Sequence, residues 1–180
     1  MTNFSDVIQN ARERARTLLA QYPQIIKNGK VDVEGLANEL GIETKEASFE
    51  DRSLAGYIRI KQGQNLIMVN RNNVPKRQRF TIAHEIGHFI LHPSQSVHVD
   101  DHDTAELVHY RNGTSSQATH LREIEANQFA SELLMPESMI LRDVNMLRTQ
   151  GKGISEIIEE LSEQYEVSQS AMTLRLNKVK

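Results

Sequence analysis

The sequence predicts an α+β fold, mostly helical, with a small antiparallel β-sheet and a C-terminal helical pair. Most of the chain shows apolar residues at the three- and four-residue spacing of amphipathic helices. Two short runs, 55–60 and 65–70, are instead rich in the residues that favour strands. The 180 residues suffice for one compact core. We divide them into a main domain, residues 1–150, and a helical segment, residues 151–180, that packs on it.

The order of the elements follows from the local signals. Helices are expected at 4–21, 32–40, 75–91, 121–134, 138–147, 154–165 and 168–179. Gly41 ends the second helix, and residues 61–64 suit a hairpin turn between the strands. Asn72 and Asn73 offer a cap for the third helix, and Pro75 suits its first turn. Residues 94–119 are polar and aperiodic, which predicts a long loop.

Composition excludes several classes of protein. There is no cysteine, so a metal would have to be held by histidine and carboxylate rather than by thiolate. The net charge of −3 gives no overall attraction to nucleic acid or to an anionic membrane. The start of the chain does not resemble a signal peptide, and no stretch approaches the roughly 20 apolar residues of a membrane span. We therefore expect a cytoplasmic protein with no membrane partner.

The third predicted helix carries the His-Glu-x-x-His pattern of a metal site. His84 and His88 lie four residues apart, so both imidazoles can point to one ion from one helical face. Glu85 lies about 100° round the helix, where its carboxylate can reach a water molecule without ligating the metal. The small residues Ala83 and Gly87 allow a neighbouring helix to approach. Zinc suits such a site, and chance spacing on an amphipathic helix is the alternative explanation.

A third protein ligand is expected on the helix at 121–134. Glu123 shares a face with Asn127, whereas Glu125 shares a face with Gln128 and Glu132 that looks solvated. We assign Glu123 as the third metal ligand and Asn127 as its supporting partner. The alternative is that both glutamates are surface charges. His92 continues the histidine spacing but lies too far along the helix, so we expect it at the helix C-terminus.

These motifs together resemble the ImmA/IrrE family of metallo-endopeptidases. The resemblance covers roughly residues 30–140 and rests on three segments: Arg79-Phe80-Thr81-Ile82-Ala83-His84-Glu85-Ile86-Gly87-His88, Glu123-x-x-Ala126-Asn127-x-Phe129-Ala130 and Leu133-Leu134-Met135-Pro136. It implies a zincin-like domain, zinc bound by the two histidines and Glu123, and a catalytic Glu85. It further implies a bacterial or phage-related protease that cleaves or inactivates a helix-turn-helix repressor.

The expected reaction is peptide hydrolysis, with Glu85 as general base and then general acid. The group that stabilises the oxyanion stays open among His109, Tyr110, Arg111 and His120. A regulator that binds DNA or a partner protein without cutting it is the alternative function. A hydrolase acting on another type of bond is a third.

Two weaker signals concern nucleic acid. Residues 76–79 place three positive charges at a helix start, which we interpret as a solvated face. Residues 157–176 have a helix-turn-helix rhythm. Its first helix is acidic and its second offers only Arg175 and Lys178, late in its length, which disfavours DNA.

Overall fold

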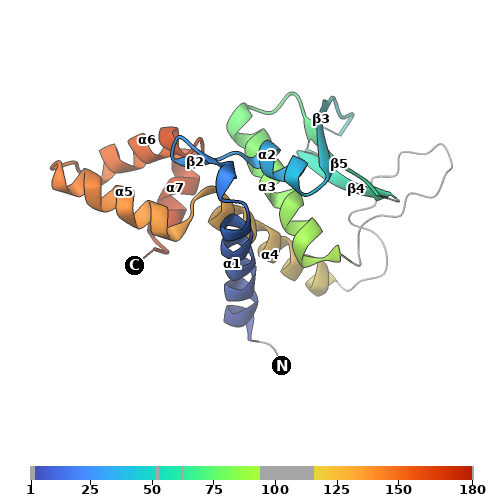
Figure 1. Cartoon of the computed structure of the whole chain (residues 1–180), viewed down its shortest axis with the longest axis horizontal. Helices are drawn as coiled ribbons and strands as arrows, with labels where there is room; N and C mark the ends of the chain where they lie inside the picture. Colours follow the sequence, from blue (N-terminus) through green and yellow to red (C-terminus); the bar gives the residue numbers. More distant parts are fainter. Residues whose placement is uncertain (1–2, 52, 62, 94–115, 180) are drawn as a thin grey trace.

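The protein has the expected α+β fold, mostly helical, in a computed structural model that describes residues 3–51, 53–61, 63–93 and 116–179 (Figure 1). The helices are α1 (Phe4–Gln21), α2 (Val33–Glu39), α3 (Pro75–Leu91), α4 (Ser116–Leu134), α5 (Glu137–Thr149), α6 (Ile154–Gln164) and α7 (Gln169–Leu176), with a 3-10 turn, η1 (Pro23–Ile25). The strands are β1 (Ile26–Lys27), β2 (Lys30–Val31), β3 (Ile42–Ala47), β4 (Gly56–Lys61) and β5 (Gln64–Asn70).

The main sheet contains the predicted hairpin and one strand that the sequence did not reveal. Strands β4 and β5 pair antiparallel, and Gly63 in their turn has a φ of 81°. Strand β3 adds parallel to β5, so the order is β3-β5-β4 and the sheet is mixed rather than purely antiparallel. Only Ile42 of β3 is fully buried. The strand therefore lacks the apolar alternation that predicts a half-buried strand.

Close contact between α3 and the elements on either side of it positions the predicted site. A Cβ added to Gly87 would lie 3.2 Å from Cα of Ala126 and from Cδ1 of Phe129, so α4 approaches α3 where a larger residue would interfere. A Cβ added to Gly56 would lie 2.5 Å from the carbonyl oxygen of Met68 and from Cγ2 of Thr81. Helix α3 is therefore held tightly between α4 and the hairpin of β4 and β5.

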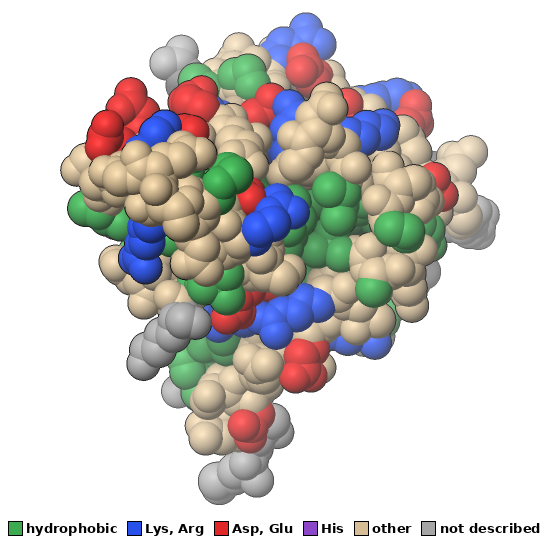
Figure 2. All heavy atoms as spheres, turned by 60° about the vertical axis from the view of Figure 1, so that its left-hand side comes forward, with side chains coloured by type: hydrophobic (Ala, Val, Ile, Leu, Met, Phe, Trp, Pro, Cys, Tyr) green, Lys and Arg blue, Asp and Glu red, His purple; other side chains and the backbone are tan. Residues whose placement is uncertain are grey.

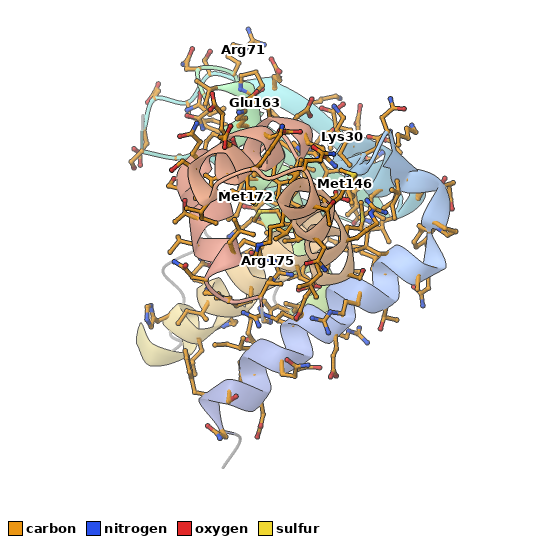
Figure 3. All side chains as sticks on the ribbon, turned by 90° about the vertical axis from the view of Figure 1, so that its left-hand side faces the viewer. Lys30, Arg71, Met146, Glu163, Met172 and Arg175 are labelled. Carbon is orange, nitrogen blue, oxygen red and sulfur yellow. The ribbon has the colours of Figure 1, made fainter. Side chains whose placement is uncertain are left out.

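The C-terminal helices α5, α6 and α7 gather at the end of the molecule opposite the main sheet (Figure 1). Helix α7 is fastened to α4 by Arg175, whose side chain is 1% exposed (Figure 3). Its Nη2 lies 2.5 Å from Oε2 of Glu132, and its Nε donates to the carbonyl oxygen of Met135 at 2.9 Å. In Figure 1, α5 lies beside α6 and α7. The division of the chain into two domains at residue 150 stays a prediction.

The predictions for the face of Glu132 and for the cap of α3 were wrong. Glu132 is fully buried, not on a solvated face, because Arg16 of α1 and Arg175 of α7 cover that side of α4. The N-cap of α3 is Val74, which makes no side-chain cap hydrogen bond, rather than Asn72 or Asn73. Pro75 does occupy the first helical turn, as expected. Across the described ranges, none of the helices is both long and apolar enough to cross a membrane.

Candidate metal centre

Helix α3 presents His84 and His88 from its last turns, on the side that faces α4. His88 is 5% exposed and His84 is 14% exposed at the side chain. Their Nε2 atoms lie 3.0 Å apart, because a four-residue step returns both rings to one face. His92 forms the C-cap of α3, as predicted, and its Nε2 lies 3.8 Å from Glu125.

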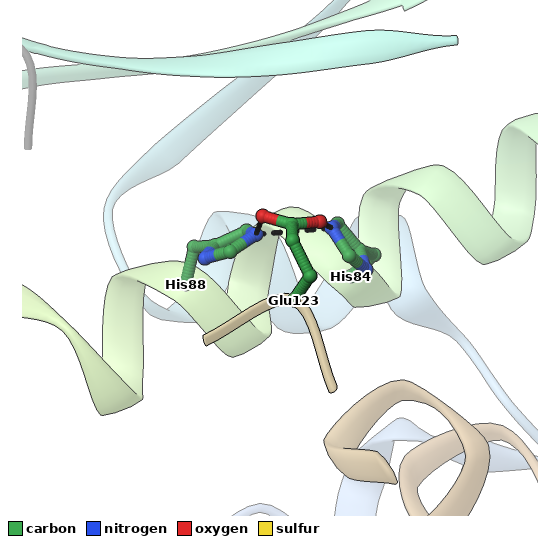
Figure 4. A group of neighbouring side chains, drawn as sticks. All are labelled: His84, His88 and Glu123. Carbon is green, nitrogen blue, oxygen red and sulfur yellow. Dashed lines mark hydrogen bonds and ion pairs between the residues drawn. The ribbon is translucent and has the colours of Figure 1, made fainter. Parts of the chain in front are cut away.

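Helix α4 brings Glu123 to the two histidines, with its carboxylate lying between the rings (Figure 4). One oxygen lies 3.3 Å from Nε2 of His84, and the other lies 3.1 Å from Nε2 of His88. The structure thus unites the three residues proposed as ligands from sequence. Among the described residues, these three also form the one group of histidine and carboxylate atoms suited to a metal ion.

The spacing of these atoms fits zinc. A tetrahedral ion with bonds of about 2.0–2.1 Å sets its ligand atoms about 3.3 Å apart. The Nε2 atoms of His84 and His88 lie 3.0 Å apart, and each faces a different oxygen of Glu123, at 3.3 and 3.1 Å. With one ligand atom taken from each residue, all three atoms lie within 4.8 Å of one another. Two imidazole nitrogens and a carboxylate oxygen are also a common donor set for catalytic zinc, with a fourth position left for water.

Asn127 supports the histidine rather than the carboxylate. Its Oδ1 lies 3.0 Å from Nδ1 of His84, so the pairing with Glu123 expected from sequence is replaced by a contact with the ligand next to it. When Nδ1 of His84 donates its proton to this amide oxygen, Nε2 keeps a free lone pair. Asn127 therefore selects the tautomer in which His84 can ligate a metal through Nε2.

Glu85 is buried beside the cluster, with a relative exposure of 6%. Its carboxylate accepts a hydrogen bond from the backbone N–H of Ile58 on β4. Its Oε2 is buried and has no hydrogen-bond partner within the described part of the chain. Burial raises the pKa of Glu85 to about 7, and the charge of His84 opposes this rise. Glu85 is therefore a buried carboxylate, held next to the three candidate ligands, whose pKa is raised mainly by burial.

The pKa values of the other two groups follow from their mutual contact. Burial alone would raise the pKa of Glu123, but hydrogen bonds from His84 and His88 bring it far below its usual value. Burial alone would lower the pKa of His84, but the hydrogen bond with Glu123, the charges of Glu85 and Glu123 and the hydrogen bond with Asn127 together raise it. The carboxylate is thus held ionised, the form required of a metal ligand.

Other parts of the site were not predictable or lie outside the described residues. The oxyanion candidates His109, Tyr110 and Arg111 fall outside them, whereas His120 is an exposed residue of α4. The role of Ile58 was missed, because a backbone N–H leaves no signature in the side-chain sequence.

The fold and the site together define a His-Glu-x-x-His class of metal site, in which one helix supplies two histidines and a glutamate and a second helix supplies another carboxylate. Comparison with known families gives the particular member of that class. Residues 37–177 match the model of Peptidase_M78, the IrrE N-terminal-like domain. The chain belongs to this family.

Two curated relatives extend the match. The chain is 30% identical over 166 residues to the radiation response metalloprotease IrrE of Deinococcus radiodurans, covering 92% of this chain and 45% of that protein. It is 30% identical over 93 residues to the IrrE metalloprotease of Deinococcus deserti, covering 52% of this chain and 30% of that protein. The chain thus spans less than half the length of these relatives.

Proposed function

We propose that the protein is a zinc-dependent endopeptidase of the cytoplasm that cleaves a regulatory protein, with a helix-turn-helix repressor as the expected substrate. The observation that carries this proposal is the buried Glu85 directly beside the cluster of His84, His88 and Glu123. A site that only stored or sensed metal would have no need of a buried carboxylate with an unpartnered oxygen.

Each residue has a distinct task in this hydrolysis. Zinc held by His84, His88 and Glu123 would supply a Lewis acid that polarises the scissile carbonyl. Glu85 takes a proton from the attacking water and passes it to the leaving amine. Its pKa of about 7 suits both transfers near neutral pH. The Ile58 N–H donates to this carboxylate and helps to hold it in place.

The edge of the sheet beside Glu85 offers a place for a peptide. Within the described part of the chain, β4 is an edge strand, and its Ile58 N–H points to Glu85 on the side away from β5. An extended peptide can add to such an edge through main-chain hydrogen bonds. This arrangement would place a scissile bond against the metal ligands, and it supports a peptide substrate over other hydrolysable bonds.

DNA has weaker support as a partner. The second predicted helix of the helix-turn-helix segment carries two cations, Arg175 and Lys178. The side chain of Arg175 is 1% exposed and paired with Glu132. On the face that brings the C-terminal helices forward, basic and acidic side chains are interspersed rather than gathered by sign (Figure 2). DNA readers present a basic surface to phosphate. The repressor substrate itself is proposed from the family resemblance.

Substitution of Glu85 tests the proposal. Glu85→Gln removes the proton carrier but keeps the shape, so we expect cleavage to fall by roughly 10²- to 10⁴-fold with zinc retained. New protein N-termini should be compared by mass spectrometry in cells that produce the wild type or the variant. Glu125→Gln, the same change outside the cluster on α4, is the matched control and should cleave normally.

The outcome separates the protease from the alternative regulator. If wild type and Glu85→Gln give the same N-termini and the same regulatory effect, the chain acts by binding, not by cutting. If cleavage is lost in Glu85→Gln while its zinc content stays normal, the role of Glu85 is established and the cut protein is the substrate.

A further inference from the structure

A pocket of about 720 Å³ lies near the N-terminal end of α3, and its lining contains no histidine. Its walls come from the β1–β2 hairpin, the start of α2, strands β3 and β5, the first turns of α3 and the end of α6. Lys30 and Glu163, which line it, lie at the same end of the molecule in Figure 3. Pockets of this volume typically hold a small organic molecule.

Arg79 gives this pocket a buried guanidinium group that carboxylates face at a distance but that lacks close hydrogen-bond acceptors. The side chain is 12% exposed, so it does not form the solvated face expected from sequence. Its Nε and Nη2 are buried and have no hydrogen-bond acceptor within the described ranges. Oε2 of Glu166 lies 4.0 Å from Nε, beyond hydrogen-bond distance. Burial lowers the pKa of Arg79, as expected for a cation whose lost hydration is incompletely replaced.

Two lysines line the same pocket, and their counterions are weakly held. Lys76 Nζ lies 2.5 Å from Oε1 of Glu163, and Lys30 pairs with Glu166. The side chains of Glu163 and Glu166 are 70% and 46% exposed. Ion pairs this exposed contribute little to stability, so both carboxylates can turn into solvent at small cost. A competing anion would then meet the two lysines and Arg79.

The start of α3 adds to the attraction for an anion. Its N-cap, Val74, provides no side-chain acceptor, and its first turn contains no acidic residue. Pro75 has no N–H, and the N–H groups of Arg77 and Gln78 donate to the carbonyl oxygen of Val74. The N–H of Lys76 and the helix dipole therefore supply the attraction for an anion at this end of α3.

The remaining walls favour an ester over a bare ion. Asp32, Glu34 and Glu46 also line the pocket, and they carry acceptor oxygens. Asp32 is already engaged by Lys27, whose Nζ lies 2.5 Å away. Carboxylates of this kind accept hydrogen bonds from hydroxyl groups and would repel a second anion. The ligand should therefore combine one phosphate with a hydroxyl-rich neutral part.

We propose that this pocket binds a phosphate ester of a hydroxyl-rich compound, of the sugar phosphate class. Arg79, Lys30 and Lys76 would hold the phosphate in place of Glu163 and Glu166. The site is separate from the metal centre, and the proposal does not rest on peptidase activity.

Calorimetric titration of the full chain at constant ionic strength tests this assignment. The probes are glucose 6-phosphate, inorganic phosphate and neutral glucose. We expect saturable binding of the first two, tighter for the ester, and none for glucose. Arg79→Gln should weaken phosphate binding by about tenfold or more, because a charge-assisted hydrogen bond is lost. Arg14→Gln, an exposed arginine of α1, is the control and should bind like the wild type.

Glu166→Gln gives an independent readout if Arg79→Gln fails to fold. Removal of the competing carboxylate should tighten binding of both phosphate probes. The proposal would be overturned if neither phosphate probe bound. It would also be overturned if both variants bound the probes like the wild type, which is the result expected if phosphate binds at the metal centre instead. Equal affinity for inorganic phosphate and glucose 6-phosphate would overturn the ester and leave free phosphate as the ligand.

Discussion

Two glutamates of α4, Glu123 and Glu132, have the same side chain and opposite roles. Both are shielded from solvent, and in both an attractive contact overcomes burial and lowers the pKa. Glu123 contacts two histidines, and neutral imidazole nitrogens can coordinate a metal ion. Glu132 contacts Arg16 and Arg175, which are permanent cations. The neighbours, rather than the glutamate, therefore decide whether the carboxylate forms a metal site or a structural clamp.

Helix geometry keeps these two roles apart. Nine residues turn an α-helix by about 180° relative to its starting direction. Glu123 therefore faces α3, while Glu132 faces α1 and α7. A change at one glutamate should leave the function of the other intact, and this expectation can be tested one residue at a time.

The largest effect is expected from loss of the metal ligand. Loss of a residue that only hydrogen-bonds to a metal ligand typically weakens metal binding by roughly 10- to 100-fold. Glu123→Ala removes a ligand itself, so we expect a larger loss of zinc affinity. Peptidase activity should disappear with the metal, whereas the melting temperature measured with chelator should change little. Zinc affinity is measured by competition with a chromogenic chelator, and normal affinity in this variant would remove Glu123 from the site.

Loss of the structural clamp should act on stability instead. Glu132→Gln leaves Arg175 buried without its counterion, so we expect a loss of about 3 kcal/mol in the free energy of unfolding. Arg16→Gln is the matched control, because Arg16 is 42% exposed and its loss should cost at most about 1 kcal/mol. Denaturant unfolding measures both. If folded Glu132→Gln bound zinc more weakly than the wild type, Glu132 would also act on the metal site, which would contradict its purely structural role.

The same clamp should respond to acid. Burial would raise the pKa of Glu132, but the hydrogen bond from Arg16 and the charge of Arg175 lower it below the ordinary 4.5. The folded state therefore gains stability from ionised Glu132 above about pH 4.5 and loses it as the pH falls further. The stability difference between wild type and Glu132→Gln should narrow below that pH. A constant difference from pH 7 to pH 3 would refute this.

The smallest effect is expected at Asn127. Asn127→Ala removes the acceptor that selects the tautomer of His84, which should weaken zinc binding about tenfold. Asn145→Ala, a change at an exposed asparagine of α5, should have no effect. Equal zinc affinity in the two variants would show that the contact with His84 does not tune the metal site.

The parts of the molecule that could be predicted from sequence are those that depend on residue spacing within one short segment. The hairpin of β4 and β5 and the histidine pair of α3 each follow from one spacing rule. The face of α4 that carries Glu123 followed from the same helical geometry. Helix α4 starts at Ser116, five residues before the predicted start, because no apolar periodicity marks its first turns.

Three missed features depend on residues distant in sequence. Burial of Glu132 requires Arg16 and Arg175, which are 116 and 43 residues away. Strand β3 is stabilised by pairing with β5 and by little burial of its own. The Ile58 N–H that orients Glu85 belongs to the backbone. Spacing rules within one segment cannot report contacts of this kind.

Metal content tests the central claim most directly. Protein purified without a metal-affinity tag should be measured by elemental analysis, beside His88→Ala, Glu123→Ala and Glu132→Gln. The account predicts about one zinc per chain in the wild type and in Glu132→Gln, and little or none in the other two. A wild-type protein that contains no metal, and takes up none when zinc is supplied, would contradict the account.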